Sequence, residues 1–114
     1  MSVSMRDTSP VLFGAALVLC GTIVAGSATA GPAVATKWRD VGESQIDCVA
    51  HAASAIRRSG FEVGDFGSQS STGRNGDYTA SIRCISDKQI AFFVMSGPEP
   101  AQVTRLLDLL YQRF

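Results

Sequence analysis

The chain has 114 residues, with ten basic and ten acidic side chains and no net charge at pH 7. This length allows one folded domain at most, and the balanced charge gives no electrostatic reason to expect nucleic acid or an anionic membrane as a partner. One histidine and three cysteines leave little material for a metal site or for acid–base catalysis by imidazole. We therefore expect no metal and no other cofactor.

Residues 1–30 have the pattern of a secretory signal peptide. Arg6 precedes an apolar run over residues 11–26, and Ala28 and Ala30 are the small residues of an A-x-A cleavage site. The alternatives are an uncleaved membrane anchor and a buried helix, but the run is shorter than the ~20 residues of a spanning helix. We expect cleavage after Ala30, export to the periplasm or the cell exterior, and no stable membrane anchor afterwards.

Export changes what the three cysteines can do. Cys20 would leave with the signal peptide, and Leu19 in front of it does not suit a lipoprotein signal, which has a small residue there. Cys48 and Cys84 remain, and an even count in an oxidising compartment favours a disulfide. Because the mature chain would have a modest core, a bridge worth about 4 kcal/mol in the chain-entropy model would matter.

Residues 31–43 show no sustained period, and the sequence predicts a flexible leader here, with Trp38 packed at the edge of the core. The folded domain is then expected over residues 44–114. Its first element is a helix over residues 44–59, for which Ser44 is a good N-cap. The residues that share the apolar face of this helix are Ile46, Val49, Ala52, Ala53 and Ile56, with Cys48 at its edge.

Three strands and a second helix are expected to follow. Residues 61–66 form a short strand, and residues 67–76 a polar loop that ends in a tight Asn-Gly turn. Residues 78–86 (YTASIRCIS) alternate apolar and polar side chains, as a strand with one buried face does. Residues 89–95 (QIAFFVM) form a third strand that is apolar on both sides. The helix after Pro100 carries leucines at helical spacing.

These elements predict an α+β domain with the order α-β-β-β-α. Short connections favour a three-stranded antiparallel meander with residues 78–86 in the middle and two helices on one face. Cys48 then lies on the core side of its helix and Cys84 on the core side of the middle strand, so the Cα atoms should lie within about 7 Å for one disulfide. This layout is common and does not by itself imply a function.

Cys48 and His51 also form a C-x-x-H pair beside Asp47. A closed metal site needs more ligands than this pair, and a reactive thiol would need a free Cys48. We favour the structural disulfide, with His51 exposed and paired with Asp47 one turn away. No serine–histidine–acid set can be assembled, so the sequence predicts no catalytic residues and no enzyme.

The glycine-rich loop over residues 67–76 resembles a phosphate-binding loop only superficially. Gly67 and Gly73 are too far apart for that motif, Arg74 stands in place of its lysine, and a strand follows where a helix is required. A mobile hairpin loop needs only polarity and glycine, and this is the interpretation we favour.

A two-residue turn at residues 87–88 would fix the pairing of the last two strands. Cys84 then faces Ala91, and Ile82 faces Phe93, on the inner face that the helices cover. The side chains left on the outer face are Arg83, Ile85, Ile90, Phe92 and Val94.

The outer strip is a candidate interface, because exposed apolar strips mark interaction sites and the third strand lies at a sheet edge. Two alternatives stay open: the leader folds over the strip, or a longer turn changes the register. The leading hypothesis is a small exported non-catalytic binding or accessory module that uses this face on a second copy or on another protein. The alternatives are a structural or stress-related protein without a ligand and, less favoured, a thiol-redox protein that uses Cys48.

Overall fold

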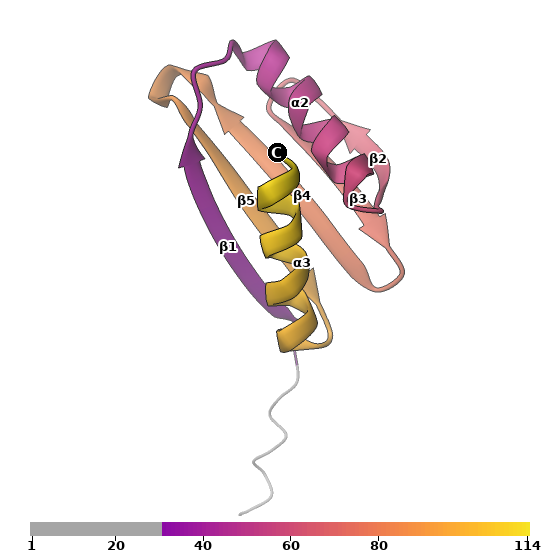
Figure 1. The fold of residues 1–114 in the computed structure, drawn as a ribbon. Helices are drawn as coiled ribbons and strands as arrows, with labels where there is room; N and C mark the ends of the chain where they lie inside the picture. The colour runs from indigo at the N-terminus through magenta and orange to yellow at the C-terminus, as the bar shows by residue number, and fades with distance from the viewer. Residues whose placement is uncertain (1–30) are drawn as a thin grey trace, which may run out of the picture. The chain divides into compact units, whose positions relative to one another are not determined.

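The computed structural model describes residues 31–114, so the predicted signal peptide, its cleavage site and Cys20 lie outside the described residues. These residues form five strands and two α-helices, with one helix after the first strand and the other after the last (Figure 1). In chain order they are β1 (Ala33–Asp40), α2 (Gln45–Arg58), β2 (Glu62–Phe66), β3 (Ser70–Asn75), β4 (Tyr78–Ile85), the short 3₁₀ helix η2 (Ser86–Lys88), β5 (Ile90–Gly97) and α3 (Pro100–Arg113).

The fold class is α+β, as predicted, but the sheet has five antiparallel strands where three were expected. Their order across the sheet is β1-β5-β4-β3-β2, so β4 is the middle strand, as predicted. The prediction of a loop over residues 67–76 was wrong, because most of this segment forms strand β3. The Asn-Gly turn does join β3 to β4, with Asn75 opposite Tyr78 and Gly76 at a φ of 59°.

The flexible leader expected over residues 31–43 was also wrong. Most of it forms β1, which pairs with β5 along its whole length, from Ala33 opposite Gly97 to Asp40 opposite Ile90. β5 is therefore an interior strand, and the sheet edge belongs to β1. The leader does not fold over the outer face: it extends that face by one strand.

The predicted register between the last two strands is confirmed. Cys84 lies opposite Ala91 and Ile82 opposite Phe93. The turn is a 3₁₀ helix that Gln89 closes, with its N–H donating to the Ser86 carbonyl at 3.0 Å. This pair is the one a two-residue loop requires, so the inner and outer sets of side chains follow the prediction.

Both helices cover the inner face of the sheet (Figure 1). The buried core between them contains Cys48, Val49, Ala52, Ala55, Ile56, Phe61, Ala80, Ile82, Cys84, Ala91, Phe93, Met95, Val103, Leu107 and Leu110. On α2, Ser44 accepts a hydrogen bond from Asp47 N, which confirms the predicted N-cap. Ile46 was wrongly assigned to the core: it is 78% exposed, because the face that meets the sheet is centred on Cys48, Ala52 and Ala55.

α2 approaches the sheet closely above β3. Ser71 is fully buried there, and its hydroxyl donates to the Val49 carbonyl of the helix at 2.9 Å. A Cβ atom on Gly73 would lie 2.4 Å from the Ile56 side chain, so only glycine leaves room for the helix at this point. The polar and glycine residues that made β3 look like a loop are therefore the residues that fit it beneath α2.

Candidate functional site: the open face of the sheet

No element within residues 31–114 covers the outer face of the sheet, because both α-helices lie on the inner face (Figure 1). Cross-strand pairing arranges the outer side chains in rows. One row runs Trp38–Phe92–Arg83 across β1, β5 and β4. The row beside it runs Asp40–Ile90–Ile85. The large apolar side chains of three strands are thus immediate neighbours.

We call the apolar part of this face the outer patch, and it consists of Val34, Trp38, Ile85, Ile90, Phe92 and Val94. Its exposure is high for large apolar side chains: Val34 is 61%, Trp38 59% and Phe92 37% exposed. Ile85, Ile90 and Val94 are half-buried by their neighbours in the sheet. A contiguous set of this kind on an open face is typical of a protein interaction surface.

The rest of the outer face is polar. β3 and β4 present hydroxyl groups there, and the hydroxyl oxygens of Thr72 and Ser81 lie 3.4 Å apart. Arg83 is exposed and lies in the same row as Phe92, at the boundary between the apolar and polar parts. An apolar centre with a polar rim and an arginine at its margin is the usual composition of a protein–protein interface.

The predicted interface residues Arg83, Ile85, Ile90, Phe92 and Val94 all project from this face. Sequence reasoning missed the contribution of Val34, which fell in the supposed leader. It wrongly placed Trp38 at the edge of the core, whereas Trp38 projects from the open face opposite Phe92. A signal existed: Val34, Thr36 and Trp38 alternate with Ala35 and Lys37. Charges at inward positions obscured it.

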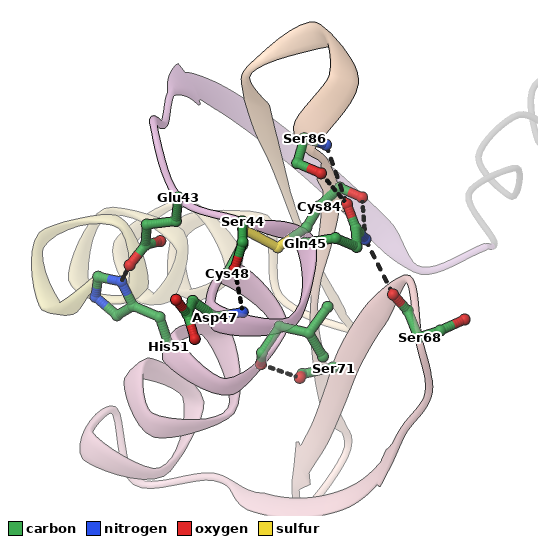
Figure 2. The surroundings of a disulfide bond; sticks show 11 residues. Glu43, Ser44, Gln45, Asp47, Cys48, His51, Ser68, Ser71, Cys84 and Ser86 are labelled. Carbon is green, nitrogen blue, oxygen red and sulfur yellow. Dashed lines mark hydrogen bonds and ion pairs between the residues drawn. A yellow bond between two sulfur atoms is a disulfide. The ribbon is translucent and has the colours of Figure 1, made fainter.

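The disulfide is present as predicted, away from the open face and within the core. Cys48 and Cys84 are joined with an S–S distance of 2.07 Å and a Cα–Cα distance of 6.1 Å, and both side chains are buried. The bridge ties α2 to the middle strand (Figure 2). Because both sulfur atoms are used, the thiol-redox alternative would need this bridge to be reduced first.

Gln45 reinforces the same junction (Figure 2). Its Nε2 donates to the carbonyls of Cys84 at 2.8 Å and Ser68 at 3.0 Å. Its Oε1 accepts from the Ser86 hydroxyl at 2.8 Å and from the Ser86 N–H at 3.0 Å. The whole amide is therefore occupied by structural contacts. It binds the start of α2 to the end of β4 and to the loop before β3.

A hollow of about 460 Å³ lies beside the exposed Ile46, between the start of α2 and the loop before β3. Its described lining is Gln45, Ile46, Val49, Ala50, Gly67 and Ser68. The amide of Gln45 is already bonded within the protein, so it offers no free group to fix a ligand. The hollow therefore provides apolar surface rather than a set of reactive groups.

His51 does not pair with Asp47, so that prediction was wrong. Its Nδ1 lies 2.9 Å from a carboxylate oxygen of Glu43, and its ring stacks on Phe114 with centroids 4.0 Å apart. Glu43 lies in the connection from β1, so His51 links α2 to that connection and to the end of α3. The side chain is thus used in packing, and only a third of it is exposed.

Within residues 31–114, no three histidine, cysteine, aspartate or glutamate side chains gather closely enough to hold a metal ion. No helix of this described part is long and apolar enough to cross a membrane. Comparison of the sequence with known proteins identifies no family, because the chain matches no protein-family model and no curated protein. The open face therefore has to be interpreted from its own residues.

Proposed function

We propose that this chain is a small exported binding module, without catalytic activity, that holds a protein partner on its outer patch. The observation that carries the proposal is the row in which Trp38 and Phe92 lie side by side on an uncovered face. Leaving these rings in water costs free energy of about 25 cal/mol for each Å² of apolar surface. A partner that covers them recovers this free energy.

The shape and composition of the face favour a protein partner over a small molecule. Small ligands bind in concave sites that enclose most of their surface, whereas the outer patch is spread over the side chains of three neighbouring strands. Tryptophan and arginine are the residues most enriched at the energetic centres of protein interfaces. Trp38 and Arg83 flank Phe92 in one row, so the patch supplies both.

Two alternatives lead to different experiments. A structural or stress-related protein without a ligand would need its outer patch covered by its own chain, and the part of the leader that forms β1 widens the patch instead. A thiol-redox protein would need Cys48 as a free thiol. Titration of the native protein with a thiol reagent tests that hypothesis, since it requires two reactive cysteines at positions 48 and 84.

Export is part of the proposal. A disulfide between Cys48 and Cys84 is compatible with an oxidising compartment, where such bonds persist. The predicted cleavage after Ala30 would leave a chain that begins at Gly31. Mass measurement of the exported protein tests this start point. Recovery of the full-length chain from a membrane fraction would contradict it.

A lysine at position 92 tests the binding surface. Phe92→Lys places a charge at the centre of the outer patch and should abolish capture of partner proteins from the exported fraction. The matched control is Thr79→Lys, which places the same charge on the polar part of the same face. Capture by this control should equal that of the wild type.

Thermal unfolding of both variants must accompany the capture experiment. Phe92 points away from the core, so both lysine variants should unfold cooperatively near the wild-type temperature. Equal capture by Phe92→Lys and the wild type would refute the binding role of the outer patch. Loss of the fold in Phe92→Lys alone would show that Phe92 is structural, and the proposal would fall with it.

A further inference from the structure

The two edges of the sheet differ in regularity. β2, at one edge, is short, contains Gly64, and shifts its register against β3 between Val63 and Asp65. Such bulges protect an edge from pairing with another chain. β1, at the other edge, has eight residues, no proline and an unbroken register against β5. Among the described residues no strand pairs with its free side.

The backbone groups on that free side can be assigned. Val41 N donates to the Gln89 carbonyl at 3.0 Å. The backbone N–H and C=O groups of successive residues in a strand point to opposite sides. Those of the odd-numbered residues of β1 therefore point to β5, and those of the even-numbered residues point to the free edge. The N–H and C=O groups of Val34, Thr36 and Trp38 therefore point outward along the edge, and no strand within residues 31–114 bonds to them.

The charged residues of β1 do not obstruct this edge. Lys37 and Arg39 point to the inner face, where α3 engages both of them. Lys37 Nζ lies 3.0 Å from an Asp108 carboxylate oxygen, and Arg39 donates to the Tyr111 carbonyl at 3.1 Å. These charges still restrict how β1 can pair with β1 of a second copy, because some registers would place like charges opposite each other.

We propose that β1 pairs antiparallel with β1 of a second copy, with Thr36 opposite the partner's Thr36. In this register Val34 lies opposite the partner's Trp38, so exposed apolar side chains cover each other. Lys37 lies opposite the partner's Ala35, and no like charges meet. The free N–H and C=O groups of Val34, Thr36 and Trp38 then bond to their counterparts.

A pairing centred on Ala35 would set Trp38 opposite Pro32, which has no N–H to donate. Charge disfavours the neighbouring registers on the other side of Thr36. A pairing centred on Lys37 opposes two lysines, and a pairing centred on Trp38 opposes Lys37 to the partner's Arg39. Like charges directly opposite each other destabilise a sheet. The proposal goes beyond the binding role of the outer patch and does not depend on it, because it concerns the backbone edge and leaves Phe92 outside the contact between copies.

Two cysteine variants test the register between the two copies of β1 directly. In the proposed dimer the two Thr36 Cα atoms lie about 5.5 Å apart, as in any hydrogen-bonded antiparallel pair, and this distance suits a disulfide. Thr36→Cys in the full chain with Cys20→Ser, and with the native bridge intact, should therefore form a covalent dimer under mild oxidation. The matched control is Val34→Cys, whose equivalent atoms would lie more than about 10 Å apart along the strands.

Two proline variants test the proposed backbone hydrogen bonds between the two copies of β1. Thr36→Pro removes an outward N–H that has no role in β1–β5 pairing, so it should halve the mass seen in sizing at unchanged thermal stability. Ala35→Pro is the control: it removes an inward N–H and should destabilise the fold itself.

Three results would overturn the proposal: a monomeric wild type at every concentration, equal cross-linking of Thr36→Cys and Val34→Cys, or a dimer that survives Thr36→Pro. If Thr36→Pro unfolds, the cysteine pair decides alone. Phe92→Lys should leave the dimer intact, so failure of the partner-binding role and failure of the dimer remain distinguishable.

Discussion

The two helices cover the same face of one sheet, but different forces hold them there. α2 is joined to the middle strand by the Cys48–Cys84 bridge, by the amide of Gln45 and by the buried hydroxyl of Ser71. α3 is held by ring packing and by charges. Phe93 contacts the rings of Tyr111 and Phe114 with centroids 5.2 and 5.3 Å away.

The charges beneath α3 lie at the sheet edge, where Lys37 and Arg39 each place a cation 4.7 Å from the centre of the Tyr111 ring. One half of the domain is thus fixed by a covalent bond and directional hydrogen bonds, and the other by apolar and cation–ring contacts that water reaches at one side. We expect the β1–α3 half to open more readily than the α2 half, as regions with fewer buried anchors do.

The largest expected effect is at the centre of the α3 half. Phe93→Ala should lower the free energy of unfolding by about 3–5 kcal/mol, because it leaves a cavity under Tyr111 and Phe114. Chemical denaturation measures this loss. The neighbouring Phe92→Ala is the control, and it should cost only about 1 kcal/mol, because its ring lies on the open face. Similar losses in both variants would contradict the assignment of the two faces.

Removal of the bridge tests the α2 half. Cys84→Ser should cost about 2–5 kcal/mol, as loss of a native disulfide does in small secreted domains. Reductant should bring the wild type to the stability of Cys48→Ser/Cys84→Ser and should leave that double variant unchanged. If reductant does not alter the wild-type denaturation midpoint, the bridge does not stabilise α2 as described.

The amide of Gln45 should contribute less than the bridge. Gln45→Ala leaves the Cys84 carbonyl and the Ser86 N–H without their partner, which should cost about 1–3 kcal/mol. Gln69→Ala, in the loop that precedes β3, is a control because that side chain is exposed. Thermal unfolding of the two variants should separate them clearly. Equal midpoints would show that water replaces the Gln45 bonds without loss.

The smallest effect is expected from the ion pair at the β1 edge. The side chains of Lys37 and Asp108 are 41% and 50% exposed. Asp108→Asn should therefore lower the free energy of unfolding by only about 0.2–1 kcal/mol. The loss should disappear at high salt, because exposed charges are screened there. Denaturation at low and high ionic strength checks this. A larger loss that salt does not reduce would show that Asp108 acts through packing.

The sequence was sufficient where one pattern had one explanation. The alternation of β4 and the turn after it predicted the register with β5, and the register predicted the outer set of side chains. The positions of Cys48 and Cys84 on the core sides of α2 and β4 predicted the bridge. Each inference used local spacing and the burial of one face. The interface role of that outer set stays a prediction, and the exposure of Phe92 is its physical basis.

The missed strands depend on contacts that no local pattern reveals. β3 is polar, and its burial becomes favourable only because Ser71 finds a carbonyl on α2 and Gly73 makes room for Ile56. β1 carries Lys37 and Arg39 on its inner face, where Asp108 and the Tyr111 carbonyl of α3 pair with them. In both cases the partner lies far away in the sequence.

The pairing of the first described strand with the last has a kinetic consequence. β2, β3, β4 and β5 each join a strand that is adjacent in sequence, so they can zip together through short loops, whereas β1 must wait for β5. Closing so long a loop is entropically costly, and contacts of high sequence separation slow folding. We therefore expect β1 to dock last although the ribosome makes it first, so that assembly at this edge runs opposite to the direction of synthesis.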